Sequence, residues 1–251
     1  MLEYWIMFPA GLVISTLAMF SGLGGGVFWM PFLLSVTGLS PHQAVVTTLL
    51  IQLFGQGSAT VANHNNKFID WKLVIMQAKA GAPAAAAGAV LSMYMQPVMI
   101  KFLLGIVIFF IAYVFLRGDD FFEKGGEHAD MKAAIKGRPI TTAGGILTGF
   151  LGIGVGDWLV PFFNKQCHLS MVRSVSTAIA LMMLLSASAL TTYLSLGAKI
   201  PWSITLPGIA GVIAGAQIGA RLLKTVSEVR FKEIFVLMLV FLATHVTFNA
   251  F

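Results

Sequence analysis

The sequence predicts an all-α protein that crosses a membrane several times and is built from two related halves. Composition predicts the membrane location: hydrophobic residues make up 57% of the 251 residues and charged residues only 10%, whereas soluble domains carry about 25% charge. An internal repeat on either side of a polar linker predicts the two halves. We expect a first transmembrane repeat over 1–117, a polar cytoplasmic linker over 118–138 and a second transmembrane repeat over 139–251.

Several apolar runs are long enough to cross a bilayer. The run from Val98 to Leu116 is interrupted only by Lys101 and Gly105, and a spanning helix needs about 20 such residues. The same criterion predicts full spans over 42–62, 73–95, 98–117, 172–195, 202–222 and 231–250. The N-terminus lacks a basic region and a small-residue cleavage site, so we expect the first apolar segment to be retained.

Residues 21–33 and 151–163 are two copies of one pattern. At an offset of 130 residues the copies share three glycines and a proline: Gly22, Gly24, Gly26 and Pro31 fall on Gly152, Gly154, Gly156 and Pro161. One residue later in register, Trp71 falls on Trp202. So long an ordered series is not a chance match, and it predicts a duplicated fold.

The glycine clusters predict that each copy forms two half-helices joined by an unwound turn. Each glycine weakens a helix by about 1 kcal/mol relative to alanine. We expect half-helices over 6–20 and 26–37, and again over 140–150 and 156–164. Interrupted segments at matching positions in two halves point to a transporter's binding site. The alternative is that the glycines are packing contacts between membrane helices.

The distribution of charge distinguishes two topologies. If each broken segment crosses the membrane, there are eight crossings, and Lys and Arg divide almost evenly between the two sides. If each is a re-entrant hairpin, each half has three full crossings and the second half is inverted. Apart from Lys79, which lies within a span, all Lys and Arg then share one side except Lys101 and Lys199. Because basic residues gather on the cytoplasmic side, we favour the inverted, re-entrant arrangement with both termini outside.

The half-helices that start at the glycines predict a site for an anion. A helix N-terminus presents unpaired N–H groups and about half a positive charge, which attracts anions without a basic side chain. Inverted symmetry directs two such ends toward one site at mid-membrane. The polar side chains of the following helices, Gln56 and Ser176 among them, can add hydrogen bonds. The candidate substrate-binding residues are Gly24, Gly25, Gly26, Thr47, Thr48, Gln52, Gly154, Gly156, Ser174 and Thr177.

Three charged residues are candidates for gating or coupling. Asp157 is an acid inside a predicted membrane segment, where it either carries a coupling proton or caps the half-helix that begins beside it. Lys79 either reaches the cytoplasmic surface along its span or helps to hold an anion. Arg173 either anchors its helix at the interface or contacts a leaving anion at a gate.

The motif SGLGGGVFWMPFL and its second copy FLGIGVGDWLVPFF resemble the TauE/SafE sulfite exporter family, and the resemblance covers essentially the whole chain. The family's Gly-Gly-Gly-x-x-x-x-Pro pattern falls on Gly24, Gly25, Gly26 and Pro31, while the second copy departs from it at Val155 and Asp157. The resemblance implies the movement of sulfite or organosulfonates such as sulfoacetate across a cell (inner) membrane.

We therefore expect a secondary transporter, in the exporting direction, for small sulfur anions such as sulfite, thiosulfate or organosulfonates, working by alternating access. The alternatives are an anion channel and a membrane sulfur-relay protein that uses the single cysteine, Cys167. We expect no enzyme activity, no cofactor and no metal site. We also expect no nucleic-acid partner, because the basic residues behind the net charge of +6 lie in short loops beside apolar spans. Whether the chain forms a homo-oligomer stays open.

Overall fold

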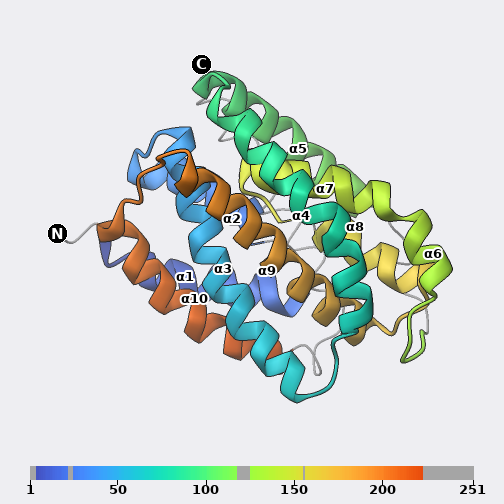
Figure 1. Ribbon diagram of the computed structural model, residues 1–251. Coiled ribbons are helices and arrows are strands. Elements are labelled where there is room, and N and C mark those ends of the chain that lie inside the picture. Colours follow the sequence, from blue (N-terminus) through green and yellow to red (C-terminus); the bar gives the residue numbers. More distant parts are fainter. Residues whose placement is uncertain (1–3, 22–24, 118–124, 155, 223–251) are drawn as a thin grey trace.

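The computed structural model describes residues 4–21, 25–117, 125–154 and 156–222, and every structural statement below concerns these residues (Figure 1). They form helices and no β-strand. Four of the helices are long and apolar enough to cross a membrane: Pro41–Asn65, Trp71–Met93, Met171–Ser195 and Trp202–Leu222. The predicted all-α, multi-pass membrane class is confirmed to this extent. The span predicted over 231–250 lies outside the described residues.

The helices follow one another in the same order before and after the polar linker. The first set is α1 (Met7–Ser21), α2 (Gly26–Phe32), the π-helix η2 (Leu33–Thr37), α3 (Pro41–Asn65), α4 (Trp71–Met93) and α5 (Pro97–Arg117). After α6 (Met131–Lys136), the second set is α7 (Arg138–Leu151), α8 (Gly156–Pro161), the π-helix η3 (Phe162–Gln166), α9 (Met171–Ser195) and α10 (Trp202–Leu222). Helices α3 and α9 each contain 25 residues.

Local sequence sets several helix ends. Ser40 and Gln43 form a capping box at the start of α3, which satisfies two backbone donors at once. Asp70 caps α4 by accepting a hydrogen bond from the Leu73 N–H at 3.0 Å. Gly38 and Gly152 end η2 and α7 with φ of 64° and 69°, a left-handed conformation that glycine adopts without steric cost.

Helices α3 and α9 pack together in the middle of the molecule, with α1 beside α10 on one flank and α7 beside α4 on the other (Figure 1). The two central helices are antiparallel. The Asp70 N–H, just beyond the end of α3, donates to Thr177 Oγ1 near the start of α9. At the opposite end, Lys199, just beyond α9, lines a pocket with His42 from the start of α3. We call these the Arg173 end and the Lys199 end, after a basic residue at each.

Close packing on both flanks depends on missing side chains. A Cβ at Gly88 of α4 would overlap the Ile146 carbonyl of α7, and a Cβ at Gly211 of α10 would overlap the Phe8 carbonyl of α1. Small residues of this kind let membrane helices approach closely. Gly88 and Gly211, which lie outside the two breaks, therefore have the packing role that is the alternative reading of the glycine clusters.

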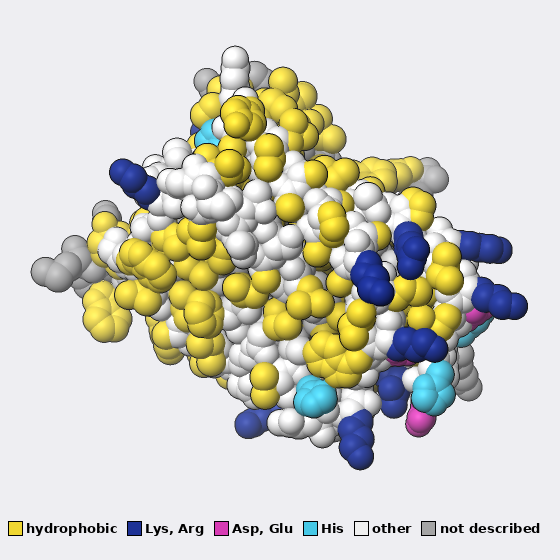
Figure 2. All heavy atoms as spheres, in the orientation of Figure 1, with side chains coloured by type: hydrophobic (Ala, Val, Ile, Leu, Met, Phe, Trp, Pro, Cys, Tyr) yellow, Lys and Arg dark blue, Asp and Glu magenta, His cyan; other side chains and the backbone are white. Residues whose placement is uncertain are grey.

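The surface has the charge distribution of a membrane protein. Figure 2 shows the Lys and Arg side chains gathered toward the lower right, which is the Arg173 end, and apolar side chains over the remaining face. The basic residues at the Arg173 end include Lys67, Lys72, Lys132, Arg173 and Arg221, whereas Lys101 and Lys199 lie at the opposite end. Exposed apolar side chains along α5, such as Phe102, Ile106 and Phe110, suit contact with lipid.

Candidate functional site

The two glycine breaks touch each other in the interior of the protein. A Cβ at Gly26, the first residue of α2, would overlap the Gly152 carbonyl at the end of α7, and would lie 2.7 Å from Ile153 Cα. Gly25 is different, because a Cβ there would find its nearest neighbour, Ala18 Cβ, at an ordinary 3.5 Å. Gly26 is thus the residue whose missing side chain permits the contact.

Gln52 of α3 joins the two breaks through its side-chain amide. Its Oε1 accepts a hydrogen bond from the Gly26 N–H at 3.1 Å, and its Nε2 donates to the Gly152 carbonyl oxygen at 2.7 Å. Gln56, one turn further along, donates to Gln52 Oε1 at 3.5 Å and accepts from Ser186 Oγ of α9 at 3.2 Å. One polar network thus links α2, α3, α7 and α9.

Three hydroxyl groups on the two central helices are fully buried without a hydrogen-bond partner. They belong to Thr47 and Thr48 of α3 and Ser176 of α9. Native proteins satisfy nearly all buried polar groups, and an unsatisfied one costs about 1–3 kcal/mol. Thr48 precedes Gln52 by four residues, so both lie on one face of α3. Water or a polar ligand would satisfy these hydroxyls at two separate places, because Thr47 and Thr48 lie toward the Lys199 end of α3 and Ser176 lies toward the Arg173 end of α9.

Two other hydroxyls predicted for the site are engaged locally. Ser174 Oγ donates to the Leu169 carbonyl at 3.3 Å, beside the start of α9. Thr177 Oγ1 accepts from the Asp70 N–H at 3.1 Å, which ties α9 to the loop before α4. The hydrogen bonds therefore do not join Ser174 or Thr177 to the network around Gln52.

The predicted glycines divide between described and undescribed segments. Gly25 precedes α2, and Gly26 is its first residue. Gly154 is buried in the non-helical segment 152–154, and Gly156 is the first residue of α8. Gly24 lies outside the described residues.

The charged candidates do not meet at the Gln52 network. Lys79 is exposed on the surface of α4. Arg173 Nη2 lies 3.9 Å from the carboxylate of Glu127, which is 80% exposed. Asp157 is the second residue of α8, and its side chain lies outside the described part.

The polar stripe of α3 continues further than the sequence prediction. Thr60 Oγ1 and Asn63 Nδ2 are also buried without a partner. They extend the four-residue spacing of Thr48, Gln52 and Gln56 toward the Arg173 end. The polar spacing along α3 could therefore have been used to predict Thr60 and Asn63 from the sequence.

Cys167 is buried and lies between η3 and α9. Burial raises the pKa of its thiol to about 12, and the carboxylates of Asp130 and Asp70 add to the shift. At neutral pH the thiol is therefore protonated, which is the unreactive form of cysteine. In the described part of the chain, no group of three or more His, Cys, Asp or Glu side chains could hold a metal ion.

Comparisons with known proteins identify relatives across nearly the whole chain. The family model described as sulfite exporter TauE/SafE matches residues 7–246. A probable membrane transporter protein of Xylella fastidiosa (strain Temecula1) is 22% identical over 246 residues, which cover 96% of this chain and 93% of that protein. The probable membrane transporter protein YfcA of Escherichia coli K12 is 29% identical over 206 residues, 79% of this chain and 73% of its own. The probable membrane transporter protein YunE of Bacillus subtilis is 25% identical over 243 residues, 88% and 89% of the two chains. No solved structure matches the chain.

Proposed function

Because the chain belongs to the sulfite exporter TauE/SafE family, we propose that it is a secondary transporter of small sulfur-containing anions. The candidate substrates are sulfite, thiosulfate and short organosulfonates such as sulfoacetate. The observation that carries the proposal is the contact between the two glycine breaks through Gln52, with the unpartnered hydroxyl of Thr48 buried one turn away on the same face of α3. Interrupted helices that meet in the interior are the usual construction of a transporter's midplane site.

The chemistry of this region suits an oxyanion. The hydroxyls of Thr47 and Thr48 can donate to anion oxygens, and they cost less to bury than fixed charges. The Gly26 N–H stands at the start of the helical segment Gly26–Thr37, where the backbone dipole favours negative charge. An anion oxygen can take the place of Gln52 Oε1 as the acceptor for this N–H. Binding would then loosen the connection between the two breaks.

Two inverted repeats with re-entrant glycine hairpins provide the two states that transport needs. Matching hydrogen bonds support this arrangement: Ser58 Oγ of α3 donates to the Ile213 carbonyl of α10, and Ser188 Oγ of α9 donates to the Ala82 carbonyl of α4. Gln56 and Ser186, which stand 130 residues apart, bond to each other, as residues near a two-fold axis can. Rocking of one repeat, 1–117, against the other, 139–251, would open the site to each side in turn.

The distribution of basic residues assigns the sides. The Arg173 end would face the cytoplasm and the Lys199 end the outside, because positive residues accumulate on the cytoplasmic side of the inner membrane. In this orientation the polar stripe of α3 runs from Thr48 toward the cytoplasmic end at Asn63 and would form part of the export path.

Two alternatives, a sulfur relay and an anion channel, can be distinguished from a carrier. A sulfur relay needs a reactive thiolate, and the burial and raised pKa of Cys167 argue against it. A channel with the same fold would give ohmic currents, whereas a carrier gives flux that saturates with anion concentration.

The test replaces Thr48 with valine, which has nearly the same shape. Because the hydroxyl of Thr48 has no partner, Thr48→Val should keep or raise the melting temperature of the purified protein. The same change should lower the flux of radiolabelled sulfite and sulfoacetate in proteoliposomes at least tenfold. Thr191→Val is the matched control, because Thr191 is exposed on α9 and bonds only to its own helix. Wild-type flux in Thr48→Val, or no saturable anion flux in the wild type, would contradict the proposal.

A further inference from the structure

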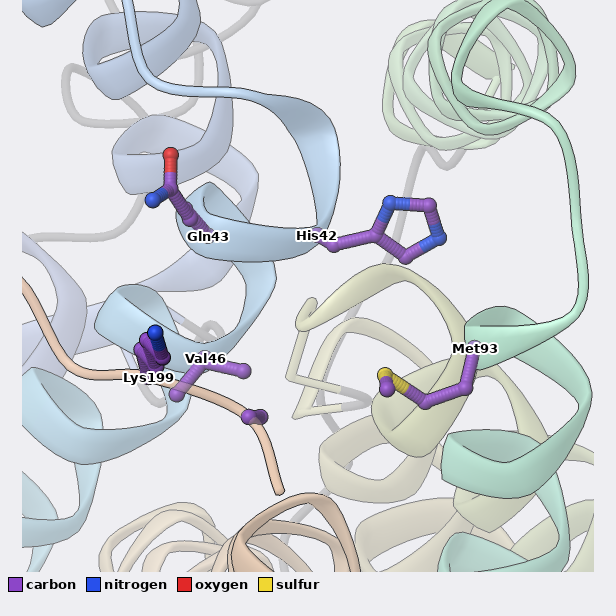
Figure 3. Close-up of a pocket in the computed structure, with 6 residues that line it drawn as sticks. His42, Gln43, Val46, Met93 and Lys199 are labelled. Carbon is purple, nitrogen blue, oxygen red and sulfur yellow. The ribbon is translucent and has the colours of Figure 1, made fainter. Parts of the chain in front are cut away.

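A pocket of about 180 Å³ opens at the Lys199 end, away from the Gln52 network (Figure 3). It is bounded by the start of α3, the end of α4 and the loop between α9 and α10. Its lining residues are His42, Gln43, Val46, Met93, Ala198 and Lys199. The pocket has room for several water molecules or for a small anion with a short carbon chain.

One wall of the pocket is fixed by a hydrogen bond between helices. His42 Nε2 lies 2.9 Å from the Ser92 carbonyl oxygen, and since a carbonyl can only accept, Nε2 carries the hydrogen. This bond joins the start of α3 to the end of α4. Figure 3 shows His42 and Met93 on one side of the space and Lys199 and Val46 on the other.

The pocket carries a positive charge, and none of the acids whose side chains the structure describes lies near it. The one ion pair in the described part of the chain, Arg173 with Glu127, lies at the opposite end. Asp70, Glu127 and Asp130 also lie at that opposite end. The ammonium of Lys199 therefore has no acidic partner among the described residues. An uncompensated positive charge raises the local concentration of anions.

We propose that this pocket is an outer binding site for small organic anions. The oxyanion head would contact the Lys199 ammonium and the Gln43 amide, and the short carbon chain would lie against Val46, Ala198 and Met93. The inference rests on the proposed transport function, and it adds a second site and a preference for substrates with an apolar part. The site would hold the anion on the outer side, before uptake or after export.

One residue that lines the pocket is the chain neighbour of a buried hydroxyl. Val46, which lines it, precedes Thr47 in α3. The repeat mate of Thr47 is Thr177, which accepts a hydrogen bond from the Asp70 N–H. Pro201 stands at the position that corresponds to Asp70, and proline has no N–H to donate. Thr47 is thus left without this partner beside the loop that carries Lys199, and it can take an anion passed inward from the pocket.

The test compares two anions at mildly acidic pH, where sulfite is the singly charged hydrogensulfite: ethanesulfonate, which has a carbon chain, and hydrogensulfite, which has none. In Lys199→Gln, the KM for flux started from the outer side should rise roughly threefold to tenfold for ethanesulfonate, with Vmax unchanged. Lys199→Arg should restore the wild-type KM because it keeps the charge. Lys101→Gln is the matched control, because Lys101 lies at the same end but does not line the pocket. The difference in the KM for ethanesulfonate between the wild type and Lys199→Gln should become smaller in high salt, because salt screens charge.

Ala198→Phe tests the apolar part of the pocket. The larger side chain should raise the KM for ethanesulfonate and leave that for sulfite unchanged, with inserted protein quantified by a fluorescent tag. An unchanged KM in Lys199→Gln, or an equal rise in Lys101→Gln, would overturn the outer site while leaving the transport proposal intact. Absence of flux for every anion in the wild type would instead overturn the proposed function.

Discussion

Replacing Gly26 with alanine should separate the two glycine breaks. The new Cβ would overlap the Gly152 carbonyl oxygen and lie 2.7 Å from Ile153 Cα and 2.9 Å from Gln52 Nε2. Overpacking of this kind costs about 1–3 kcal/mol, and each of the two Gln52 hydrogen bonds contributes about 0.5–1.5 kcal/mol. The helix propensity of alanine returns about 1 kcal/mol. We expect a net loss of about 1–5 kcal/mol from these terms and a loss of most anion flux.

Gly57→Ala is the matched control for this prediction. Gly57 is not among the candidate site residues, and a Cβ there would meet only Met183 Sδ, at an ordinary 3.8 Å. Both variants are assayed for melting temperature in detergent and for sulfoacetate flux in proteoliposomes, per amount of inserted protein. Gly57→Ala should behave as the wild type. Equal behaviour of the two variants, whether both active or both inactive, would refute the reasoning from the Gly26–Gly152 contact.

Two further predictions concern Gln52 and Cys167. Gln52→Leu leaves the Gly26 N–H and the Gly152 carbonyl without their partner, and each unsatisfied group costs about 1–3 kcal/mol of stability. The melting temperature of Gln52→Leu should therefore fall further than that of Gln56→Leu. An equal fall in the two variants would contradict the bridging role of Gln52. Because the Cys167 thiol has a pKa raised to about 12, it stays protonated at pH 7.5, and N-ethylmaleimide should label it only after unfolding in detergent. Rapid labelling of the folded protein at that pH, or loss of flux in Cys167→Ala, would show that the thiol is accessible or needed.

The helices could be predicted well from the sequence because their causes are local. The length of each apolar run is read directly from the sequence. The capping residues Ser40 and Asp70 lie directly beside the helix ends that they set. The predicted spans over 42–62 and 172–195 accordingly fall within α3 and α9. The positions of the glycine clusters likewise anticipated where α1 ends and α2 begins.

The partners of individual polar residues could not be predicted, because they depend on contacts between distant segments. Gln52 and Gly152 are 100 residues apart, and nothing in either segment specifies that they meet. Ser174, Ser176 and Thr177 are similar residues within one turn of α9. Each residue is rotated by about 100° from the one before, so packing decides that Ser176 is unpartnered while the other two are engaged. Gly24 and the side chain of Asp157 lie outside the described part of the structure, so their roles stay predictions.

The most direct test of alternating access at the Gln52 network is the accessibility of a cysteine placed at Thr48. In a Cys167→Ala background, Thr48→Cys would be treated with a membrane-impermeant, negatively charged methanethiosulfonate reagent from each side of the membrane in turn. Thr48 is fully buried, and the proposed alternating access predicts that a cysteine there reacts from both sides and is protected by ethanesulfonate in both cases. Reaction from one side only, or reaction that ethanesulfonate does not slow, would contradict the account.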